Sequence, residues 1–320
     1  MKNKILNILK ENKDKLISGT YIADTLNITR SYVSKVIKEL IENDFIIETI
    51  DRSGYIYRND YRVLNITKEY ISNTQINNIY QLDKIDSTNK FLKDLANKNE
   101  DEITLVIANY QTHGRGRLGR TFISNKGKGI YMSILLRPKY SISTSQRITS
   151  LVATSVSNAI DKICNVETKI KWVNDIYLNN KKIAGILTEG QTNFESKKVE
   201  YIVVGIGINL YHQDFPEELD NIVTTLEDET NNIYSKNELV KEIINQIILY
   251  YNHLEENIHI TEYRNKSYVI NKNVELNIHG IIKHGKVLNI DDDGELIVLI
   301  DNKKETINSG EITKVRLYNE

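Results

Sequence analysis

Apolar residues recur at every third or fourth position in three short segments near the start of the chain. They do so over residues 5–9, over residues 22–26 after a Ser-Gly-Thr start signal, and over residues 33–41. This is the period of an amphipathic helix that buries one face. The pattern therefore predicts three helices in quick succession.

Alternation with a period of two follows the third helix. The runs 45–50 and 55–58 flank an Asp-Arg-Ser-Gly turn, which predicts a β-hairpin. Three helices and a hairpin together predict a winged helix-turn-helix domain over residues 1–64. The polar side of the third helix carries cations and hydroxyls that suit phosphates and base edges. These candidate DNA-binding residues are Arg30, Ser31, Tyr32, Ser34, Lys35 and Lys38. A module that binds another protein is the alternative.

Beyond this domain the pattern changes twice. Residues 65–80 are polar and predict a linker or a connecting helix, after which strand-like and helical segments mix. The whole stretch 65–270 therefore predicts a catalytic domain of the α+β class with a mixed sheet. From 271 to 320, short strands separated by Gly, Asn and Asp turns predict a small SH3-like β-barrel. The central strand-like runs are 103–108, 130–136, 167–173, 176–178, 183–188 and 201–210, and the helical segments are 88–97, 144–163 and 236–254.

Composition and charge add few constraints. The 320 residues are 40% hydrophobic and 27% charged, which is typical of a folded protein. The net charge is -1, and residues 1–64 carry 11 Lys and Arg against 9 Asp and Glu, or +2, so DNA binding has to come from a local patch. The single cysteine, Cys164, excludes an internal disulfide, predicts a buried thiol and fits a cytoplasmic location. We find neither a signal-peptide core nor a run apolar enough for a bilayer, and expect no membrane association.

The strongest motif is the glycine-arginine loop, Gly-Arg-Gly-Arg-Leu-Gly-Arg at residues 114–120. Its glycine spacing matches a dinucleotide fingerprint, but a polar loop follows in place of an apolar helix, and no acidic residue stands about 20 positions on. Guanidinium groups between glycines predict a mobile clamp for phosphate or carboxylate. Taken alone, the loop could also be an RGG-like, solvated or nucleic-acid-binding segment.

Charged residues also enter two predicted strands. Residues 171–178 (Lys-Trp-Val-Asn-Asp-Ile-Tyr-Leu) are joined by an Asn-Asn turn to residues 181–189 (Lys-Lys-Ile-Ala-Gly-Ile-Leu-Thr-Glu). A period of two places Lys171, Val173 and Asp175 on one face of the first strand. Burying Lys and Asp is costly unless they pair or meet a charged ligand, so the alternatives are a structural ion pair and a binding site.

In this order the motifs resemble the signatures of the biotin protein ligases. That family has a Ser-Thr-Asn segment, here at 87–89, the glycine-arginine loop, a Lys-Trp-Pro-Asn-Asp strand, a lysine followed by Ala-Gly, and Gly-x-Gly-x-Asn, here at 205–209. With the winged helix in front and the barrel behind, the resemblance covers essentially the whole chain and indicates the subgroup that also represses the biotin operon. Three departures stand out: Val173 replaces the proline, Phe122 replaces a tryptophan that commonly covers the adenine, and Leu118 replaces an arginine of some relatives.

The resemblance implies a ligase that forms biotinyl-5′-AMP from biotin and ATP with Mg²⁺, and transfers biotin to a lysine of a biotin carboxyl carrier protein domain. For biotin binding it implies Ser87, Thr88, Asn89, Gln111, Arg115, Gly116, Arg117 and Lys182. For the nucleotide and the adenylate we expect Arg115, Arg117, Arg120, Phe122, Lys171, Asn174, Asp175 and Asn209. Catalytic roles are expected for Lys182, Arg117 and Asp175, and Asp175 is also the candidate contact for Mg²⁺ because no dedicated metal cage is visible.

The resemblance further implies a transcriptional repressor with biotinyl-5′-AMP as corepressor, a homodimer in the adenylate-bound form and biotin operator DNA as partner. Three alternatives stay open: a ligand-sensing repressor that has lost catalysis, a lipoate ligase, and a ligase whose N-terminal domain no longer binds DNA.

Overall fold

The computed structural model describes residues 1–138, 144–193 and 198–316, which form two compact units. The first unit contains Met1–Asn65 together with Ile233–Asn237, and the second contains Ile66–Asn232 and Glu238–Glu320. Among the described residues, no helix is long and apolar enough to cross a membrane.

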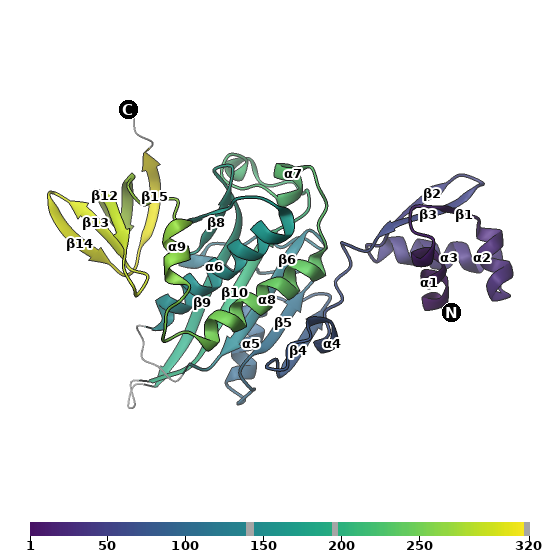
Figure 1. Ribbon diagram of the computed structural model, residues 1–320, viewed down its shortest axis with the longest axis horizontal. Coiled ribbons are helices and arrows are strands. Elements are labelled where there is room, and N and C mark those ends of the chain that lie inside the picture. Colours follow the sequence, from purple (N-terminus) through teal and green to yellow (C-terminus); the bar gives the residue numbers. More distant parts are fainter. Residues whose placement is uncertain (139–143, 194–197, 317–320) are drawn as a thin grey trace. The chain divides into compact units, whose positions relative to one another are not determined.

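The first unit is the winged helix-turn-helix that the apolar pattern predicts. Its helices are α1 (Lys2–Glu11), α2 (Gly19–Leu26) and α3 (Arg30–Glu42), and its strands are β1 (Leu16–Ile17), β2 (Ile46–Ile50) and β3 (Gly54–Asn59). The strands form one sheet in the order β1-β3-β2 (Figure 1). The hydroxyls of Ser18 and Thr29 accept hydrogen bonds from the first turns of α2 and α3, which fixes where both helices begin. The helices and the hairpin bury one apolar core that includes Ile5, Ile22 and Val33.

The second unit is built on a seven-stranded sheet in the order β4-β5-β6-β10-β9-β8-β7. Only β4 and β5 pair in parallel among these strands, and the other neighbours are antiparallel. The strands are β4 (Asn78–Leu82), β5 (Thr104–Ala108), β6 (Gly129–Leu136), β7 (Lys169–Lys171), β8 (Asp175–Leu178), β9 (Lys181–Asn193) and β10 (Lys198–Asn209).

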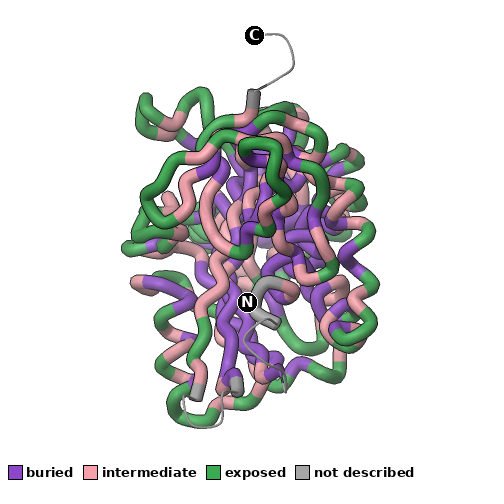
Figure 2. Tube along the Cα trace, turned by 90° about the vertical axis from the view of Figure 1, so that its left-hand side faces the viewer, coloured by how far each residue is buried: buried purple, intermediate pink, exposed green. Residues whose placement is uncertain are grey.

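Helices cover both faces of this sheet, which explains why every residue of β5 and β6 is buried. The long helices α6 (Thr144–Cys164) and α8 (Lys236–Asn252) lie across the face turned to the viewer in Figure 1. On the other face, α5 (Thr88–Ala96) packs Leu92 against Val106, Leu135 and Val203. Figure 2 shows the buried residues following the strands in the interior. The shorter helices are α4 (Lys68–Ile71), α7 (Leu226–Thr230) and α9 (Ile260–Asn265), with 3-10 turns at Arg117–Gly119 and Glu217–Leu219.

The small C-terminal β domain is also present. Its five strands run in the order β14-β13-β12-β11-β15. They are β11 (Asn273–Ile278), β12 (Ile281–Ile290), β13 (Leu296–Ile300), β14 (Lys303–Ile307) and β15 (Glu311–Arg316). Residues 291–294 form the turn between β12 and β13, and this turn docks on the catalytic domain. Arg147 pairs with Asp293, Arg264 pairs with Asp292, and the Trp172 indole N–H donates to the Gly294 carbonyl.

Two local predictions are wrong. Residues 65–80 are not simply a linker or helix, because Asn78–Leu82 is an edge strand. Lys171 and Asp175 do not share a face of one strand either, because the chain reverses at Trp172–Asn174 and the two residues face each other as partners of an antiparallel pair. Alternation along a sequence cannot reveal such a reversal when no Gly or Pro marks the turn. The Asn179-Asn180 turn and the buried Cys164 are as predicted.

Candidate active site

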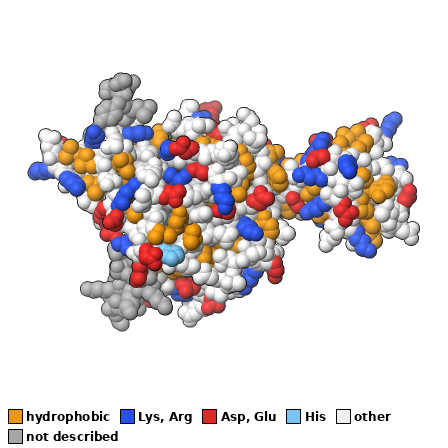
Figure 3. Space-filling model, in the orientation of Figure 1, with side chains coloured by type: hydrophobic (Ala, Val, Ile, Leu, Met, Phe, Trp, Pro, Cys, Tyr) orange, Lys and Arg blue, Asp and Glu red, His pale blue; other side chains and the backbone are white. Residues whose placement is uncertain are grey.

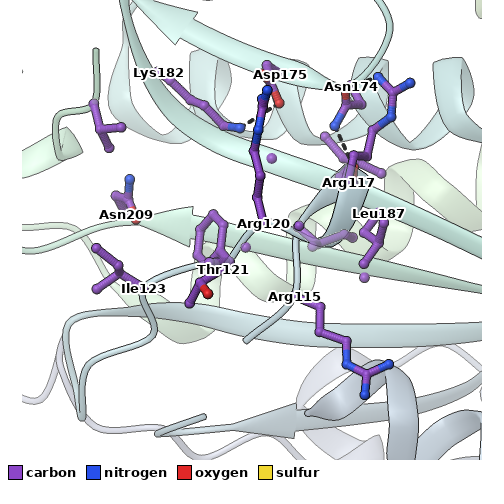
Figure 4. Close-up of a pocket in the computed structure, with 18 of the residues that line it drawn as sticks. Arg115, Arg117, Arg120, Thr121, Ile123, Asn174, Asp175, Lys182, Leu187 and Asn209 are labelled. Carbon is purple, nitrogen blue, oxygen red and sulfur yellow. Dashed lines mark hydrogen bonds and ion pairs between the residues drawn. The ribbon is translucent and has the colours of Figure 1, made fainter. Parts of the chain in front are cut away.

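One cavity of about 450 Å³ gathers the candidate ligase residues from widely separated parts of the chain (Figure 4). That volume is within the usual range for small-molecule sites. Its walls come from the first turn of α5, the glycine-arginine loop, strands β8, β9 and β10, and the start of β15. The predicted residues that line it are Ser87, Thr88, Asn89, Gln111, Arg115, Gly116, Arg117, Arg120, Phe122, Lys171, Asn174, Asp175, Lys182 and Asn209.

A buried network of neutral polar groups forms one part of the cavity. The Gln111 Oε1 atom accepts from the backbone N–H of Thr88 at 2.8 Å, and Gln111 Nε2 donates to Ser124 Oγ at 3.0 Å. The Ser133 hydroxyl, which is fully buried, lies 2.7 Å from Thr88 Oγ1 and 2.6 Å from Asn89 Oδ1. Uncharged donors and acceptors held in fixed places suit a neutral, polar ligand ring.

Two glycines of β10 leave room for the side chains opposite them. A Cβ atom at Gly205 would lie 2.3 Å from Asn89 Oδ1, and one at Gly207 would lie 2.5 Å from the Phe122 ring. Both distances are far below a normal contact. The Gly-x-Gly-x-Asn pattern is therefore needed here for close approach of Asn89 and Phe122 to the strand.

Cations dominate the other part of the cavity. Five lysine and arginine side chains line the cavity against two carboxylates, Asp175 and Glu311, an excess of three positive charges. Lys182 Nζ lies 2.7 Å from Asp175 Oδ1, and both side chains are about three-quarters buried. Burial lowers the pKa of Lys171, and the neighbouring Asp175 carboxylate acts in the opposite direction. Such a field favours a polyanionic ligand.

Strand β15 and the residue before it help to hold the glycine-arginine loop. The Arg117 guanidinium donates to Asn174 Oδ1 at 3.0 Å and to the Gly310 carbonyl at 2.8 Å. Arg120 forms a two-pronged ion pair with Glu311 on β15. Bidentate pairs of this kind fix the orientation of a guanidinium. The loop is therefore anchored between Asn174, just before β8, and the C-terminal domain.

Arg115 is placed differently from the other two arginines of the loop. Figure 4 shows Lys182, Asp175 and Arg120 pointing toward one another, while the Arg115 guanidinium points away from them. Arg115 is exposed, and its charge acts on Glu189 near the first turn of α5. The structure thus brings Arg117, Arg120, Lys171 and Lys182 to one end of the cavity and leaves Arg115 outside that group.

Several residues that line the cavity or hold its lining residues were not singled out from the sequence. Ser133 was detectable as a lone hydroxyl in the apolar run 130–136, and Glu189 as a charge at the end of another apolar run. Glu189 accepts from Asn89 Nδ2 at 2.9 Å and from Lys93 Nζ at 2.6 Å, and so orients Asn89. Glu311 lies in the C-terminal domain, and nothing in the sequence pattern connects it with the loop at Arg120.

The candidate DNA-binding residues lie in the first unit. Arg30, Ser31, Tyr32, Ser34, Lys35 and Lys38 are all exposed on α3, while the opposite side of the helix is buried. Arg58 of the wing is not expected to contact DNA, because its guanidinium already pairs with Glu48 at 2.8 Å and with Asp14 at 3.1 Å. On the face of the molecule that Figure 3 shows, positive and negative side chains are interspersed, so a field that favours DNA has to arise from a local patch.

Three family models match consecutive parts of the chain. They are the HTH domain over residues 2–56, the Biotin/lipoate A/B protein ligase family over residues 82–209, and the Biotin protein ligase C terminal domain over residues 269–315. Their order agrees with the domains described above.

Individual proteins are similar over much greater lengths. The chain is 38% identical to the bifunctional ligase/repressor BirA of Bacillus spizizenii over 71% of this chain and 70% of that protein. Identity to BirA of Bacillus subtilis is 36% over the same shares. Among solved structures, the biotin protein ligase from Aquifex aeolicus in complex with biotin and ATP is similar, with a TM-score of 0.65 and 28% identity over 75% of this chain and 99% of that chain.

Proposed function

The chain belongs to the biotin protein ligases of the bifunctional ligase/repressor type, and from this premise we propose how its residues divide the work. It is an ATP-dependent ligase that activates biotin and attaches it to a protein lysine, combined with a DNA-binding repressor domain. The domain boundaries that we propose are residues 1–64, 65–270 and 271–320.

The neutral polar network is the proposed biotin subsite. Ser87, Thr88, Asn89 and Gln111 offer the paired donors and acceptors that an uncharged ureido ring requires. Burial of this network makes each unmatched group costly, so a ring that lacks these groups is rejected. We propose that Arg117, Lys182 and the backbone at Gly116 receive the biotin carboxylate, and that Arg115 closes the rim of this subsite.

The cationic end is the proposed nucleotide subsite. Arg117, Arg120, Lys171 and Lys182 face the phosphates there, and Phe122 offers a ring face for stacking on the adenine. Asn174 and Asn209, both buried, supply further amide groups. Arg115 was also expected in this subsite, but its direction in Figure 4 favours the biotin side.

The first reaction joins two anions. An oxygen of the biotin carboxylate attacks the α-phosphorus of ATP, a C–O–P linkage forms, and the bond to the β-phosphate breaks to release pyrophosphate. Four converging cations offset the repulsion between the reactants and stabilise the charge that develops on the phosphoryl oxygens.

In the second reaction an uncharged lysine amine attacks the acyl carbon. The bond to the phosphate oxygen breaks, AMP leaves and an amide forms. We propose that Asp175 accepts the proton that the amine must lose, because its buried Oδ1 has an ionic partner in Lys182 but receives no hydrogen bond of good geometry.

Mg²⁺ is proposed as the companion of ATP. Among the described residues no group of three or more His, Cys, Asp or Glu side chains could hold a metal ion. One carboxylate combined with substrate phosphates is a usual arrangement for Mg²⁺, and Asp175 is the carboxylate that fits. When bound, the ion would neutralise phosphate charge.

The observation that carries the proposal is the junction of a neutral polar subsite and a cationic subsite in one cavity. Full-length protein incubated with MgATP, biotin and a biotin carboxyl carrier domain should add one biotin to the carrier, detected by mass spectrometry. Lipoate in place of biotin should give no addition. Labelling with lipoate alone would indicate a lipoate ligase, and no labelling with either vitamin would indicate a repressor without catalysis.

The repressor function is proposed to use α3 on biotin operator DNA, with biotinyl-5′-AMP as corepressor. A homodimer of the adenylate-bound protein would match an operator with two half-sites. Consumption of ATP and the single buried thiol both fit a cytoplasmic location.

Replacing Lys35 with alanine should weaken DNA binding and reduce its salt dependence. Each lost phosphate contact lowers the slope of log affinity against log salt concentration by about 0.9. Fluorescence anisotropy with a labelled duplex over a salt series measures that slope for the full chain. Arg58→Gln is the matched control, because Arg58 already pairs with Glu48 and Asp14 and should leave the slope unchanged. Equal slopes for Lys35→Ala and the unaltered protein would contradict the assignment of α3.

A further inference from the structure

The segment Trp172–Asn174 carries the cavity residues that precede β8, yet it lies outside both neighbouring strands. β7 ends at Lys171 and β8 begins at Asp175, so these residues have no place in the ladder between the strands. Asn174 holds Arg117, and Asp175 pairs with Lys182 directly after it. A shift of this segment would therefore displace Arg117 and Lys182, two of the four cations that are proposed to face the phosphates.

Hydrogen bonds from other elements hold the segment. Asn174 is bound twice to Ile186 on β9, through its side-chain Nδ2 at 2.8 Å and its backbone carbonyl at 2.9 Å. The Trp172 indole donates to Gly294 of the C-terminal domain at 2.9 Å. Between them, the Val173 carbonyl accepts from the Tyr263 hydroxyl of α9 at 2.9 Å.

The surroundings of Tyr263 favour its hydrogen bond to the Val173 carbonyl. Its side chain is only 1% exposed, so the Val173 carbonyl is paired where water has little access. Burial raises the pKa of Tyr263 far above its ordinary value, and the hydroxyl therefore keeps its proton as a donor. Its hydroxyl contacts Val173 between Trp172 and Asn174, which both line the cavity, so the phenol lies just behind this part of the cavity wall.

We propose that Tyr263 is a positioning residue of the ligase reaction, acting through the Val173 carbonyl on Asn174 and Asp175. This inference rests on the proposed function. Tyr263 is not among the residues that line the cavity, so its effect is indirect. Loss of the hydroxyl leaves a buried carbonyl unpaired and allows the segment to move, which misplaces Arg117 and Lys182 while the neutral network around Gln111 stays intact.

The test compares Tyr263→Phe with Tyr250→Phe in the full chain. Tyr250 is a buried tyrosine whose hydroxyl donates to Glu262 at 2.8 Å and accepts from Asn158 at 3.1 Å, so Tyr250→Phe loses at least as much hydrogen bonding without touching the segment. Biotin-dependent exchange of pyrophosphate into ATP gives kcat and the KM of each substrate. We expect Tyr263→Phe to lower kcat about tenfold or more and to leave the KM of biotin within about twofold, since one misplaced charge-stabilising group costs at least this much. Tyr250→Phe should retain kcat.

Unchanged kcat in Tyr263→Phe, or equal losses in both variants, would overturn the inference. Should Tyr263→Phe fail to fold, Trp172→Phe releases the same segment from Gly294. A lower kcat with an unchanged KM of biotin in Trp172→Phe would then support the inference, and a wild-type kcat would refute it. If the unaltered protein itself shows no exchange with biotin, the proposed function fails, which is distinct from failure of the role of Tyr263.

Discussion

A variant with Lys182 replaced by alanine should form biotinyl-5′-AMP at least about a hundred times more slowly than the unaltered protein. Loss of one charge-stabilising donor at a reaction centre typically has an effect of this size. The substitution also leaves the Asp175 carboxylate without its cation, 2.7 Å away, in a cavity where two anions have to meet. Lost attraction and new repulsion act in the same direction. Biotin-dependent pyrophosphate exchange measures the result.

The neighbouring lysine provides a control for this prediction. Lys181 donates to the Asp220 carbonyl and is not among the residues lining the active-site cavity, so Lys181→Ala should keep nearly full activity. The double variant Lys182→Ala with Asp175→Asn separates the two effects: measured without Mg²⁺, it should bind ATP more tightly than Lys182→Ala alone, because the repulsive carboxylate is gone. An exchange rate within about threefold of wild type in Lys182→Ala would remove this lysine from the reaction centre.

Adding a single methyl group to Gly205 or to Gly207 of β10 should strongly raise a KM value of the enzyme, but for a different substrate in each case. The Cβ of Gly205→Ala would overlap with Asn89, which cannot retreat because Glu189 and the Leu187 carbonyl hold its amide. The Cβ of Gly207→Ala would overlap with the Phe122 ring. We expect Gly205→Ala to raise the KM of biotin about tenfold or more, and Gly207→Ala to do the same to the KM of ATP.

These two variants control each other, because both place the same group on the same strand two residues apart. Steady-state kinetics with each substrate varied in turn separates their effects. If both raise the KM of the same substrate, the division of the cavity into a biotin subsite and a nucleotide subsite is wrong.

The sequence predicts those parts of the molecule in which the spacing of apolar residues and the turn residues beside them indicate the same element. The helices of the first unit, the strands around Leu105 and Ile134, and the turn at Asn179 follow from apolar spacing and turn residues. The edge strand at Asn78–Leu82 was missed because Asn78 and Gln81 interrupt its apolar residues, so it has neither an apolar run nor a regular alternation. Its pairing with β5 stabilises it as a strand, and that contact is invisible to a local pattern.

The candidate site shows the same division. Lys182, Asp175 and Arg117 could be singled out because charge inside an apolar or glycine-rich run needs an explanation. The partners Gly310 and Glu311 could not, because they are ordinary turn and strand residues whose importance comes only from contact with Arg117 and Arg120. Likewise, the period of two suggested that Lys171 and Asp175 share one face of a single strand, whereas they meet across a hairpin.

The anchoring of the glycine-arginine loop on β15 affects the order in which the parts of the active site form during translation. A ribosome that has made residues 1–270 has already supplied every side chain proposed to touch biotin. Arg117 can then pair with Asn174 but still lacks the Gly310 carbonyl, and Arg120 lacks Glu311, because Gly310 and Glu311 are translated after residue 270. Because domains fold as they emerge, the vitamin subsite is expected to form first and the phosphate-binding end last. Translation products that stop short of β15 should consequently be able to recognise the vitamin without activating it efficiently.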